Sequence, residues 1–375
     1  MQRRSYRHFI KANVAPETVK SIAVFNGDNK KVCSIPLGNL GQTDETKSYS
    51  FLLISDVHII YHTANEDFQR ALTFAENADC KFTCICGDLT ETGVASELEQ
   101  YKTTVDNYAK TKPVYAMSGN HETGIEEMTF DKLIPYTKYP LFYSFGVDCQ
   151  GNKVAEDLAK TPFVYDNNVK DIYIMVGYAG NGSYSGWSSP YFVTVEEIQW
   201  LYETLEANRN KRCFIFNHVY PYQDGVGDAD RLYNANYWST SDNSIGQAFI
   251  SLLKHYKNTI LFHGHSHLRY YLQSIDRMAN YSDLFGYRSV HISSLAVPRD
   301  RTNEGGGYTN VFAESEGYVI DVYDNHIILN ARDFIDNEKD GHIIPLGTYK
   351  IDTTLQIIEA NTFTDSTGTI KGATT

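Results

Sequence analysis

Five short segments of this sequence carry side chains that can bind a metal ion or transfer a proton. They are Ser55-Asp56-Val57-His58, Gly87-Asp88-Leu89-Thr90, Gly119-Asn120-His121-Glu122, Asn217-His218 and Gly264-His265-Ser266-His267. The candidate ligands in these segments are two carboxylates, four imidazoles and one carboxamide: Asp56, Asp88, His58, His218, His265, His267 and Asn120. His121 is a further imidazole, outside this ligand set. Oxygen and nitrogen donors without a thiolate suit borderline divalent metals such as Mn²⁺, Fe²⁺, Zn²⁺ or Ni²⁺. The segments therefore predict a metal centre if the fold brings them together.

The spacing within the segments is compatible with two ions. Asp56 and His58 can reach one ion from a single extended turn, and His265 and His267 can reach toward two ions from one loop. Asp88 is the natural carboxylate to bridge the pair. Two ions held about 3.5–4 Å apart clamp a phosphoryl oxygen and ionise a bridging water. Their four positive charges would exceed the negative charge of two aspartates and a hydroxide, which leaves a locally cationic pocket for a phosphate.

The elements that must position these segments alternate between strands and helices from Ser50 onward. We expect strands at 51–54, 82–86, 114–117, 171–176, 213–216 and 259–262, and helices at 66–78, 96–108, 194–205 and 245–255. This alternation predicts a βαβ core with a largely parallel sheet. Each of the five segments follows an expected strand, and ligand sites of open α/β sheets lie beyond the carboxyl ends of strands. Segments far apart in sequence can therefore converge on one crevice.

Three domains are expected along the chain. Residues 1–48 read as a small β element and linker, with a hairpin whose strands at 21–25 and 31–35 flank Asn26-Gly27. Residues 49–350 form the main domain, in which 123–170 look like a less regular insertion and 290–293 and 317–328 read as late strands. Residues 351–375 read as a Thr-rich tail. Both flanks are compatible with a chain taken from a longer protein.

The motifs DxH, GD, GNHE, a lone His and GHxH, in this order, resemble the signature of the calcineurin-like metallophosphoesterases over roughly residues 50–300. The resemblance implies an α/β fold with four αββα layers, in which two mixed β-sheets pack face to face between helices. It implies two divalent or mixed-valence ions of the Mn, Fe or Zn type and in-line attack of a metal-bridging hydroxide on a phosphate ester. By the same resemblance, Asp56, His58, Asp88 and His267 hold the first metal; Asp88, Asn120, His218 and His265 hold the second; and His121 is the general acid.

Details of the motifs favour one branch of this family. Purple acid phosphatases have a tyrosine ligand shortly after the second-motif aspartate and a glycine in place of His58, whereas Leu89-Thr90-Glu91-Thr92 follows Asp88 here. The chain is more similar to the class III cyclic-nucleotide phosphodiesterase branch. It departs from that branch at the fourth motif, which often reads HHP there and reads His218-Val219-Tyr220-Pro221 here. We therefore expect a phosphodiesterase, with a phosphomonoesterase of the same fold as one alternative. Another is an interaction or structural module of a larger surface or phage-associated protein.

Three further residues are candidates for substrate contact. Tyr220 and Tyr222 follow the fourth-motif histidine and could stack on a base or ring, although packing within a loop is the alternative. Arg299 follows a late strand and could bind a phosphate with two hydrogen bonds, although an ion pair with a nearby carboxylate is the alternative.

Composition excludes several classes of protein. With 42% hydrophobic and 21% charged residues in 375, the chain can bury a core, and it contains no apolar run of about 18 residues that would cross a membrane. A net charge of −13 opposes a broad grip on polymeric nucleic acid, and the family resemblance implies a small phosphate ester as the partner. Six cysteines are too few for a disulfide scaffold, and we expect Cys84 and Cys86 on opposite faces of one strand. The first residues lack the apolar core of a signal peptide, which favours a cytoplasmic location and leaves the oligomeric state open.

Overall fold

The computed structural model describes residues 21–25, 31–36, 46–123, 128–180, 193–219, 244–270, 281–282, 286–301, 308–335, 344–353 and 357–360. The helices are α1 Ala64–Asn77, α2 Ala95–Tyr108, the 3₁₀ turn η2 His121–Thr123, α3 Ile134–Thr137, α4 Val195–Ala207 and α6 Ser244–His255. The first strands are β1 Ser21–Phe25, β2 Lys31–Pro36, β3 Tyr49–Ile54, β4 Cys80–Cys86, β5 Val114–Met117, β6 Phe142–Val147, β7 Lys153–Asp157, β8 Asp171–Val176 and β9 Arg212–Phe216. The remaining strands are β10 Thr259–His263, β11 Tyr281–Ser282, β12 Ser289–His291, β13 Arg299–Arg301, β14 Tyr308–Asn310, β15 Glu316–Val322, β16 His326–Asp333, β17 Ile344–Asp352 and β18 Ile357–Ala360.

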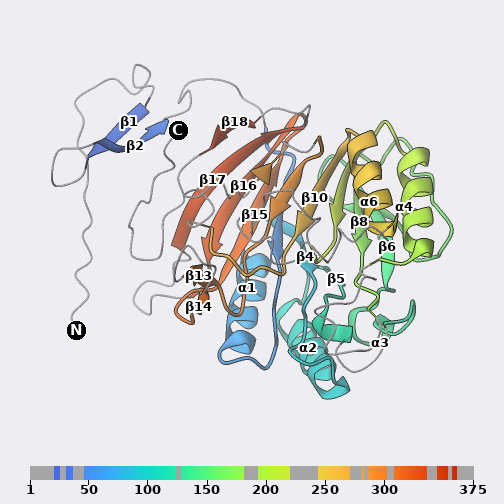
Figure 1. Cartoon of the computed structure of the whole chain (residues 1–375), viewed down its shortest axis with the longest axis horizontal. Helices are drawn as coiled ribbons and strands as arrows, with labels where there is room; N and C mark the ends of the chain where they lie inside the picture. The colour runs from blue at the N-terminus through green and yellow to red at the C-terminus, as the bar shows by residue number, and fades with distance from the viewer. Residues whose placement is uncertain are drawn as a thin grey trace.

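Two seven-stranded mixed sheets form the centre of the molecule (Figure 1). One has the order β18-β17-β16-β15-β3-β4-β5, and the other has the order β11-β12-β10-β9-β8-β6-β7. The expected βαβ strands do pair parallel, because β3, β4 and β5 run parallel, as do β8, β9, β10 and β12, but neither sheet is largely parallel as the sequence predicts. The other neighbours in these sheets pair antiparallel, including the late strands β15 and β16.

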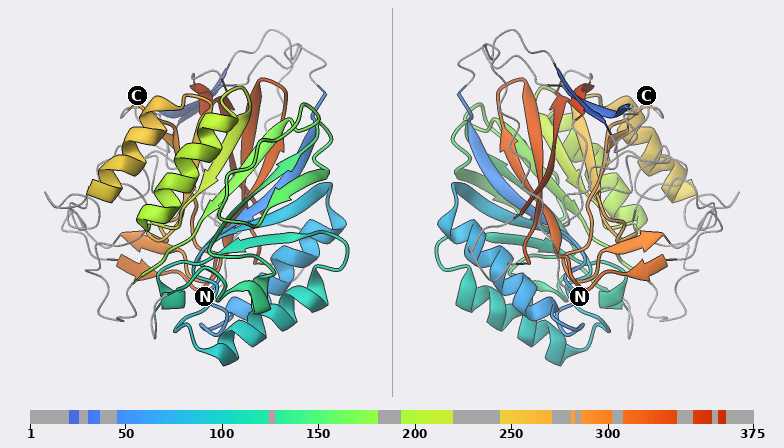
Figure 2. Two further views of the ribbon diagram at one scale, coloured as in Figure 1. Left: turned by 90° about the vertical axis from the view of Figure 1, so that its right-hand side faces the viewer. Right: turned by 90° about the vertical axis from the view of Figure 1, so that its left-hand side faces the viewer.

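Apolar side chains fill the three interfaces between four layers. Phe51 and Phe82 from one sheet meet Tyr173 and Phe214 from the other in the interface between the sheets. Phe68 of α1 and Tyr101 of α2 pack on the outer face of the first sheet, and α4 and α6 cover the outer face of the second (Figure 2). The protein therefore has the four-layer αββα sandwich expected from its motifs.

Local sequence signals account for several element boundaries. The capping box at the start of α4 is present: Glu197 N donates to Thr194 Oγ1 at 3.1 Å, and Thr194 N donates to the Glu197 carboxylate at 2.6 Å. Satisfying two otherwise free amides in this way stabilises a helix start by about 1 kcal/mol. The strands of the expected N-terminal hairpin are also present and antiparallel, whereas its turn at 26–30 lies outside the described residues.

Two sequence expectations are wrong. Residues 142–147 are not part of an irregular insertion but form β6, which is buried along its whole length and pairs with β8 and β7. Cys84 and Cys86 do not face opposite ways. Both side chains lie in the core between the sheets, because residues two apart on a strand share a face. Both are free thiols, and burial raises their pKa well above the ordinary value.

Candidate metal centre

The five chemistry-bearing segments all follow strands whose carboxyl ends meet at one edge of the sandwich. Three of them leave β3, β4 and β5 of one sheet, and two leave β9 and β10 of the other. Backbone and side-chain contacts tie the two groups together across the sheets: His265 N donates to Asp56 Oδ2 at 3.1 Å, and His218 Nδ1 lies 2.6 Å from Cys86 O. The convergence expected from the sequence is therefore present.

One group of side chains surrounds Asp56. Its Oδ1 atom lies 2.9 Å from His267 Nε2, which in turn lies 3.3 Å from His58 Nε2. His58 Nε2 also lies 3.6 Å from Asp88 Oδ2. These four residues can each offer a ligand atom within 4.8 Å of the others, and all four are buried.

A second group shares Asp88 with the first. His218 Nε2 lies 3.0 Å from Asp88 Oδ2, and Asp88, His218 and His265 offer ligand atoms within 4.8 Å of one another. His265 Nδ1 lies 2.9 Å from Asn120 Oδ1, which places the carboxamide beside this group. The seven residues expected to bind metal are thus brought together, with Asp88 common to both groups.

The donor chemistry of the cluster fits divalent cations. Nδ1 of His218 faces the carbonyl of Cys86, and Nδ1 of His267 faces the carbonyl of Val297 at 3.1 Å, so each Nδ1 carries the proton. In the neutral imidazoles each Nε2 is then a lone-pair acceptor that faces an aspartate, which is also an acceptor. The buried atoms Asp56 Oδ1 and His218 Nε2 make no hydrogen bond. Acceptors that face acceptors in a buried site must be joined by positive charge. At His218 beside Asp88 a proton supplies that charge in the metal-free protein, and a cation can take its place, so the residues fit a metal centre.

Electrostatics keep some of these ligands in the forms that bind metals and hold protons on others. Burial alone would lower the pKa of His218, but the charges of Asp88 and Asp56 outweigh it and raise this pKa to about 9. The pKa of His58 is likewise raised against burial, by Glu91, Asp88 and Asp56. A cation that binds to these two imidazoles must therefore displace their protons.

Burial alone would raise the pKa of Asp56, but the neighbouring His267 and His218 outweigh it and hold the pKa below its ordinary value. Burial lowers the pKa of His265 to about 3, so its imidazole is neutral near pH 7. Burial also lowers the pKa of His267, to about 4, with a contribution from the charge of Arg299.

The backbone at the site is strained. Five of the seven non-glycine residues with positive φ in the described part of the chain are candidate ligands: Asp56 (54°), His58 (42°), Asp88 (49°), His265 (73°) and His267 (61°). A non-glycine residue in this region costs of order 1–3 kcal/mol and persists only where its surroundings enforce it. Such clustering of strain is typical of a functional site.

Glycines let the backbone approach these ligands closely. A Cβ on Gly119 would lie 2.2 Å from Asp88 Oδ1 and 2.3 Å from Asp88 N, and one on Gly264 would lie 2.5 Å from Asp56 Oδ2. The glycines of GNHE and GHSH are therefore part of the geometry that holds the carboxylates.

His121 lies at the rim of the cluster. Its ring packs edge-on against His58 with centroids 4.5 Å apart, and its Nε2 atom lies 3.9 Å from Asp88 Oδ2. Its backbone N donates to Asp88 Oδ1 at 2.9 Å.

Acidic residues around the cluster were not singled out from the sequence. Glu122 accepts hydrogen bonds from Gly119 N at 2.6 Å and from the amide and hydroxyl of Thr90, both at 2.8 Å, and so ties the GD loop to the GNHE loop. Glu91 lies 2.8 Å from His58 Nδ1. The sequence does hold a signal for both residues: Glu122 directly follows His121, and Glu91 comes three residues after Asp88.

The expected substrate contacts are placed only in part. Tyr220 and Tyr222 lie outside the described residues. Arg299 begins β13, and its backbone N donates to His267 O at 2.8 Å, so it lies next to the candidate ligands.

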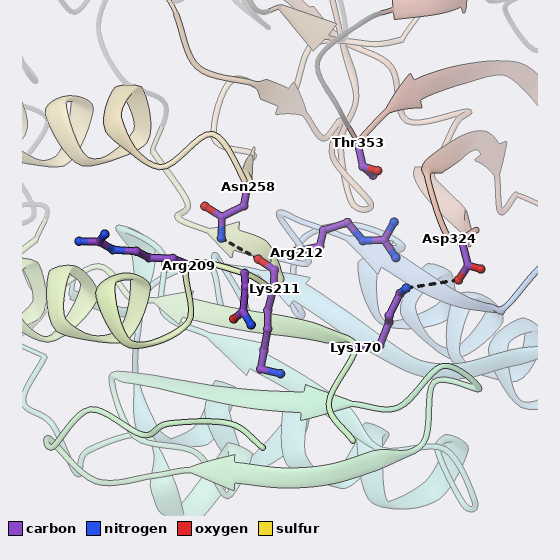
Figure 3. Close-up of a pocket in the computed structure, with 8 residues that line it drawn as sticks. Lys170, Arg209, Lys211, Arg212, Asn258, Asp324 and Thr353 are labelled. Atoms are coloured by element: carbon purple, nitrogen blue, oxygen red, sulfur yellow. Dashed lines mark hydrogen bonds and ion pairs between the residues drawn. The ribbon is translucent and has the colours of Figure 1, made fainter. Parts of the chain in front are cut away.

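A cavity of about 300 Å³ lies at the opposite ends of β8 and β9 (Figure 3). Its lining is rich in cations: Lys170, Arg209, Asn210, Lys211, Arg212, Asn258, Asp324 and Thr353. All four of these cations are already bonded, and Arg209 Nε donates to Glu206 at 2.8 Å. Arg212 pairs with Asp171 at 2.6 Å, Lys170 pairs with Asp324 at 3.5 Å, and Lys211 Nζ donates to backbone carbonyls. The cavity lies where β8 and β9 begin, whereas the candidate metal ligands lie beyond the carboxyl ends of the strands, so the cavity is separate from the candidate metal centre.

Comparison with known proteins identifies the family of the chain. Residues 49–269, more than half of the chain, match the model of the calcineurin-like phosphoesterase family, and the chain belongs to that family. No curated protein matches it significantly. None of the helices among the described residues has the length and apolar character that a bilayer crossing requires.

Solved structures with a similar fold are distant in sequence. A dimetal phosphatase from Danio rerio is 12% identical with a TM-score of 0.47, covering 80% of this chain and 98% of that one. GAP50, the anchor in the inner membrane complex of Plasmodium, is 13% identical with a TM-score of 0.48, covering 84% and 90%. Purple acid phosphatase PPD1 from yellow lupin (Lupinus luteus) is 14% identical with a TM-score of 0.47, covering 88% and 58%.

Proposed function

We propose that this protein is a dinuclear metal-dependent phosphoesterase that acts on phosphodiesters in preference to monoesters. The observation that carries the proposal is the position of the Asp88 carboxylate, whose Oδ2 atom lies 3.0 Å from His218 Nε2 and 3.6 Å from His58 Nε2. A carboxylate shared in this way by two ligand groups is suited to bridge two cations. The family membership of residues 49–269 supports the same reaction class.

The proposed ligand sets follow from the two groups. Asp56, His58, Asp88 and His267 hold one ion, and Asp88, Asn120, His218 and His265 hold the other. When bound, such a pair supplies positive charge to the phosphoryl oxygens and lowers the pKa of an attacking water. The donor set, which lacks thiolates, favours Mn²⁺, Fe²⁺ or Zn²⁺.

His121 is proposed as the general acid. Its Nδ1 atom lies 2.5 Å from the carbonyl oxygen of Glu91, so that nitrogen donates to the carbonyl and the Nε2 edge faces the cluster. In the imidazolium form Nε2 carries a second proton, which this edge directs toward the cluster and can give to the leaving group, leaving the neutral ring with its proton on Nδ1. Proton donation of this kind typically contributes 10²–10⁴-fold to a rate.

The preference for diesters rests on the residues around the second motif. His58 occupies the DxH position, and the residues after Asp88 are Leu89, which is buried, and Thr90, whose hydroxyl donates to Glu122. This arrangement offers no tyrosine ligand at that position and favours a phosphodiesterase. Substrate contacts by Arg299, Tyr220 and Tyr222 are part of the proposal. So is the division into residues 1–48, 49–350 and 351–375, but β17 runs across the last boundary and pairs with β18, so residues up to 360 belong to the main sheet.

The test is hydrolysis by metal-reconstituted protein. The protein is stripped with a chelator, reloaded with Mn²⁺, Fe²⁺ or Zn²⁺, and assayed with bis(p-nitrophenyl) phosphate and p-nitrophenyl phosphate. We expect turnover only after reloading, with the higher kcat/KM for the diester. Faster hydrolysis of the monoester would favour a phosphomonoesterase. Full metal loading without turnover of either ester would favour an interaction or structural module.

A further inference from the structure

Glu91 contacts two functional histidines through two different groups. Its Oε2 atom lies 2.8 Å from His58 Nδ1, and its backbone carbonyl oxygen lies 2.5 Å from His121 Nδ1. The two imidazoles are also in contact with each other, edge to face. One residue thus faces the outer nitrogen of a candidate metal ligand and the outer nitrogen of the candidate general acid.

The backbone of Glu91 is itself held by a second glutamate. The buried carboxylate of Glu97, in the first turn of α2, accepts hydrogen bonds from Glu91 N at 2.9 Å, Thr92 N at 2.8 Å and Thr92 Oγ1 at 2.5 Å. Three hydrogen bonds to one buried carboxylate anchor this loop to a helix rather than leaving it free. The carbonyl that faces His121 is therefore in a fixed position.

We propose that Glu91 is a positioning residue that sets the orientation of His58 through its carboxylate and of His121 through its carbonyl, with Glu97 anchoring both. The inference rests on the proposed function, because it assigns a task to a residue beside the proposed metal and acid groups. A carboxylate beside a ligand histidine's outer nitrogen favours the tautomer that carries the proton there and makes the other nitrogen a better ligand. The Glu91 carboxylate makes this contact with His58 Nδ1 as an ion pair at 2.8 Å rather than as an aligned hydrogen bond. For His58 that other nitrogen is Nε2, which faces Asp88 and His267.

A direct ligand role for Glu91 is the competing assignment. His58, Glu91 and His121 offer ligand atoms within 4.8 Å of one another, so an ion at that point is geometrically conceivable. The contact of Glu91 is with Nδ1 of His58, whereas the groups that contain Asp56 and Asp88 are contacted by Nε2. In the positioning role Glu91 contacts Nδ1 of His58, and Nε2 stays available to bind the metal.

The test measures metal affinity separately from rate. Mn²⁺ is titrated into metal-free wild type and variants while the electron paramagnetic resonance signal of free Mn²⁺ is followed. Glu91→Ala should bind one class of Mn²⁺ about 10–100-fold more weakly, the range typical for losing a partner of a ligand histidine. Glu91→Gln keeps an oxygen acceptor for His58 Nδ1 and should recover much of the affinity. Glu99→Ala is the matched control, because Glu99 is an exposed glutamate on α2 and should bind as wild type does.

A second variant tests the anchor. Glu97→Ala removes the hydrogen bonds that hold the Glu91 backbone, so Mn²⁺ affinity should fall, but by less than in Glu91→Ala, because the Glu91 carboxylate is still present. Hydrolysis at saturating Mn²⁺ should slow more for a diester with a poor alkyl leaving group than for bis(p-nitrophenyl) phosphate, because only the poor leaving group needs a proton from His121.

The outcomes separate this inference from the proposed function. Unchanged Mn²⁺ affinity in Glu91→Ala would overturn the positioning role while leaving the proposed function intact. Loss of one whole ion in both Glu91→Ala and Glu91→Gln would also overturn it, because Glu91 would then be a ligand. Failure of the wild type itself to bind Mn²⁺ would remove the proposed function and this inference with it. If Glu91→Ala does not fold, as judged by circular dichroism, Glu91→Asp replaces it in the Mn²⁺ titration. Its side chain is one methylene shorter and cannot keep the 2.8 Å contact, so the same loss of Mn²⁺ affinity is expected.

Discussion

Oδ2 of Asp88 lies 3.0 Å from Nε2 of His218, a residue that reaches it from the opposite sheet. The same oxygen lies 3.6 Å from Nε2 of His58 in its own sheet. The Asp88 carboxylate is therefore in contact with candidate ligands from both sheets. Its φ of 49° shows that the backbone is strained at this residue.

Replacing Asp88 should remove both ions rather than one. Asp88→Ala deletes the carboxylate that belongs to both ligand groups, so we expect neither ion to be retained and hydrolysis to be abolished. Metal content measured by mass spectrometry after gel filtration checks this. The control is Asp79→Ala, which changes an aspartate whose side chain is 75% exposed and should keep full metal content. Retention of one ion by Asp88→Ala would mean that Asp88 serves a single site.

Replacing His121 should leave the metals in place and slow the reaction. His121→Ala removes the proposed proton donor, and we expect a rate loss of about 10²–10⁴-fold, largest for poor leaving groups. Metal content and kcat for esters of graded leaving-group pKa are measured on the same preparation. An empty site in His121→Ala would show that the histidine holds the metal centre together instead.

Adding one methyl group at Gly119 should distort the site. The new Cβ would lie 2.3 Å from the backbone N of Asp88, which cannot move aside as a side chain can, so metal affinity and activity should both fall. Gly286→Ala is the control: its nearest neighbour would be Lys254 Cγ at 3.8 Å, and its φ of 84° should cost only about 1–3 kcal/mol of stability. Equal metal affinity in Gly119→Ala and wild type would show that the close approach is not required.

Glu197 should make the stability of the fold depend on pH. Burial raises the pKa of this capping-box carboxyl from 4.5 to about 8, so the folded state holds a proton that the unfolded state releases. Its contribution is therefore complete below about pH 4.5 and is lost as the pH rises toward 8, at about 1.4 kcal/mol per pH unit. Glu197→Gln keeps a hydrogen-bond acceptor for Thr194 N and should flatten this dependence. Urea unfolding of both proteins across this range measures the difference, and parallel curves would contradict the assignment.

The sequence was sufficient for the strands that carry the site, because each ligand segment directly follows a short apolar run. Phe142–Val147 escaped detection for a physical reason. Ser144 and Gly146 resemble turn residues, yet Ser144 Oγ bonds Tyr165 OH at 2.7 Å, and a Cβ on Gly146 would lie 2.6 Å from Val169. The small size of these two residues allows close packing around a buried strand. Neither the spacing of apolar residues nor strand propensity predicts such packing.

The seven candidate ligands could be proposed from motif order, whereas the residues that hold them could not. Glu91 reaches His58 only because Glu97 fixes the backbone of its loop, and that relationship depends on where α2 begins. Glu122 likewise joins two loops that come from different strands. Such partners are set by tertiary placement, which carries no local sequence pattern.

The most direct measurement is an anomalous difference map from a crystal of the protein soaked in Mn²⁺. We expect two peaks about 3.5–4 Å apart, one on each side of the Asp88 carboxylate. A single peak, or peaks away from Asp88 and His218, would contradict this expectation.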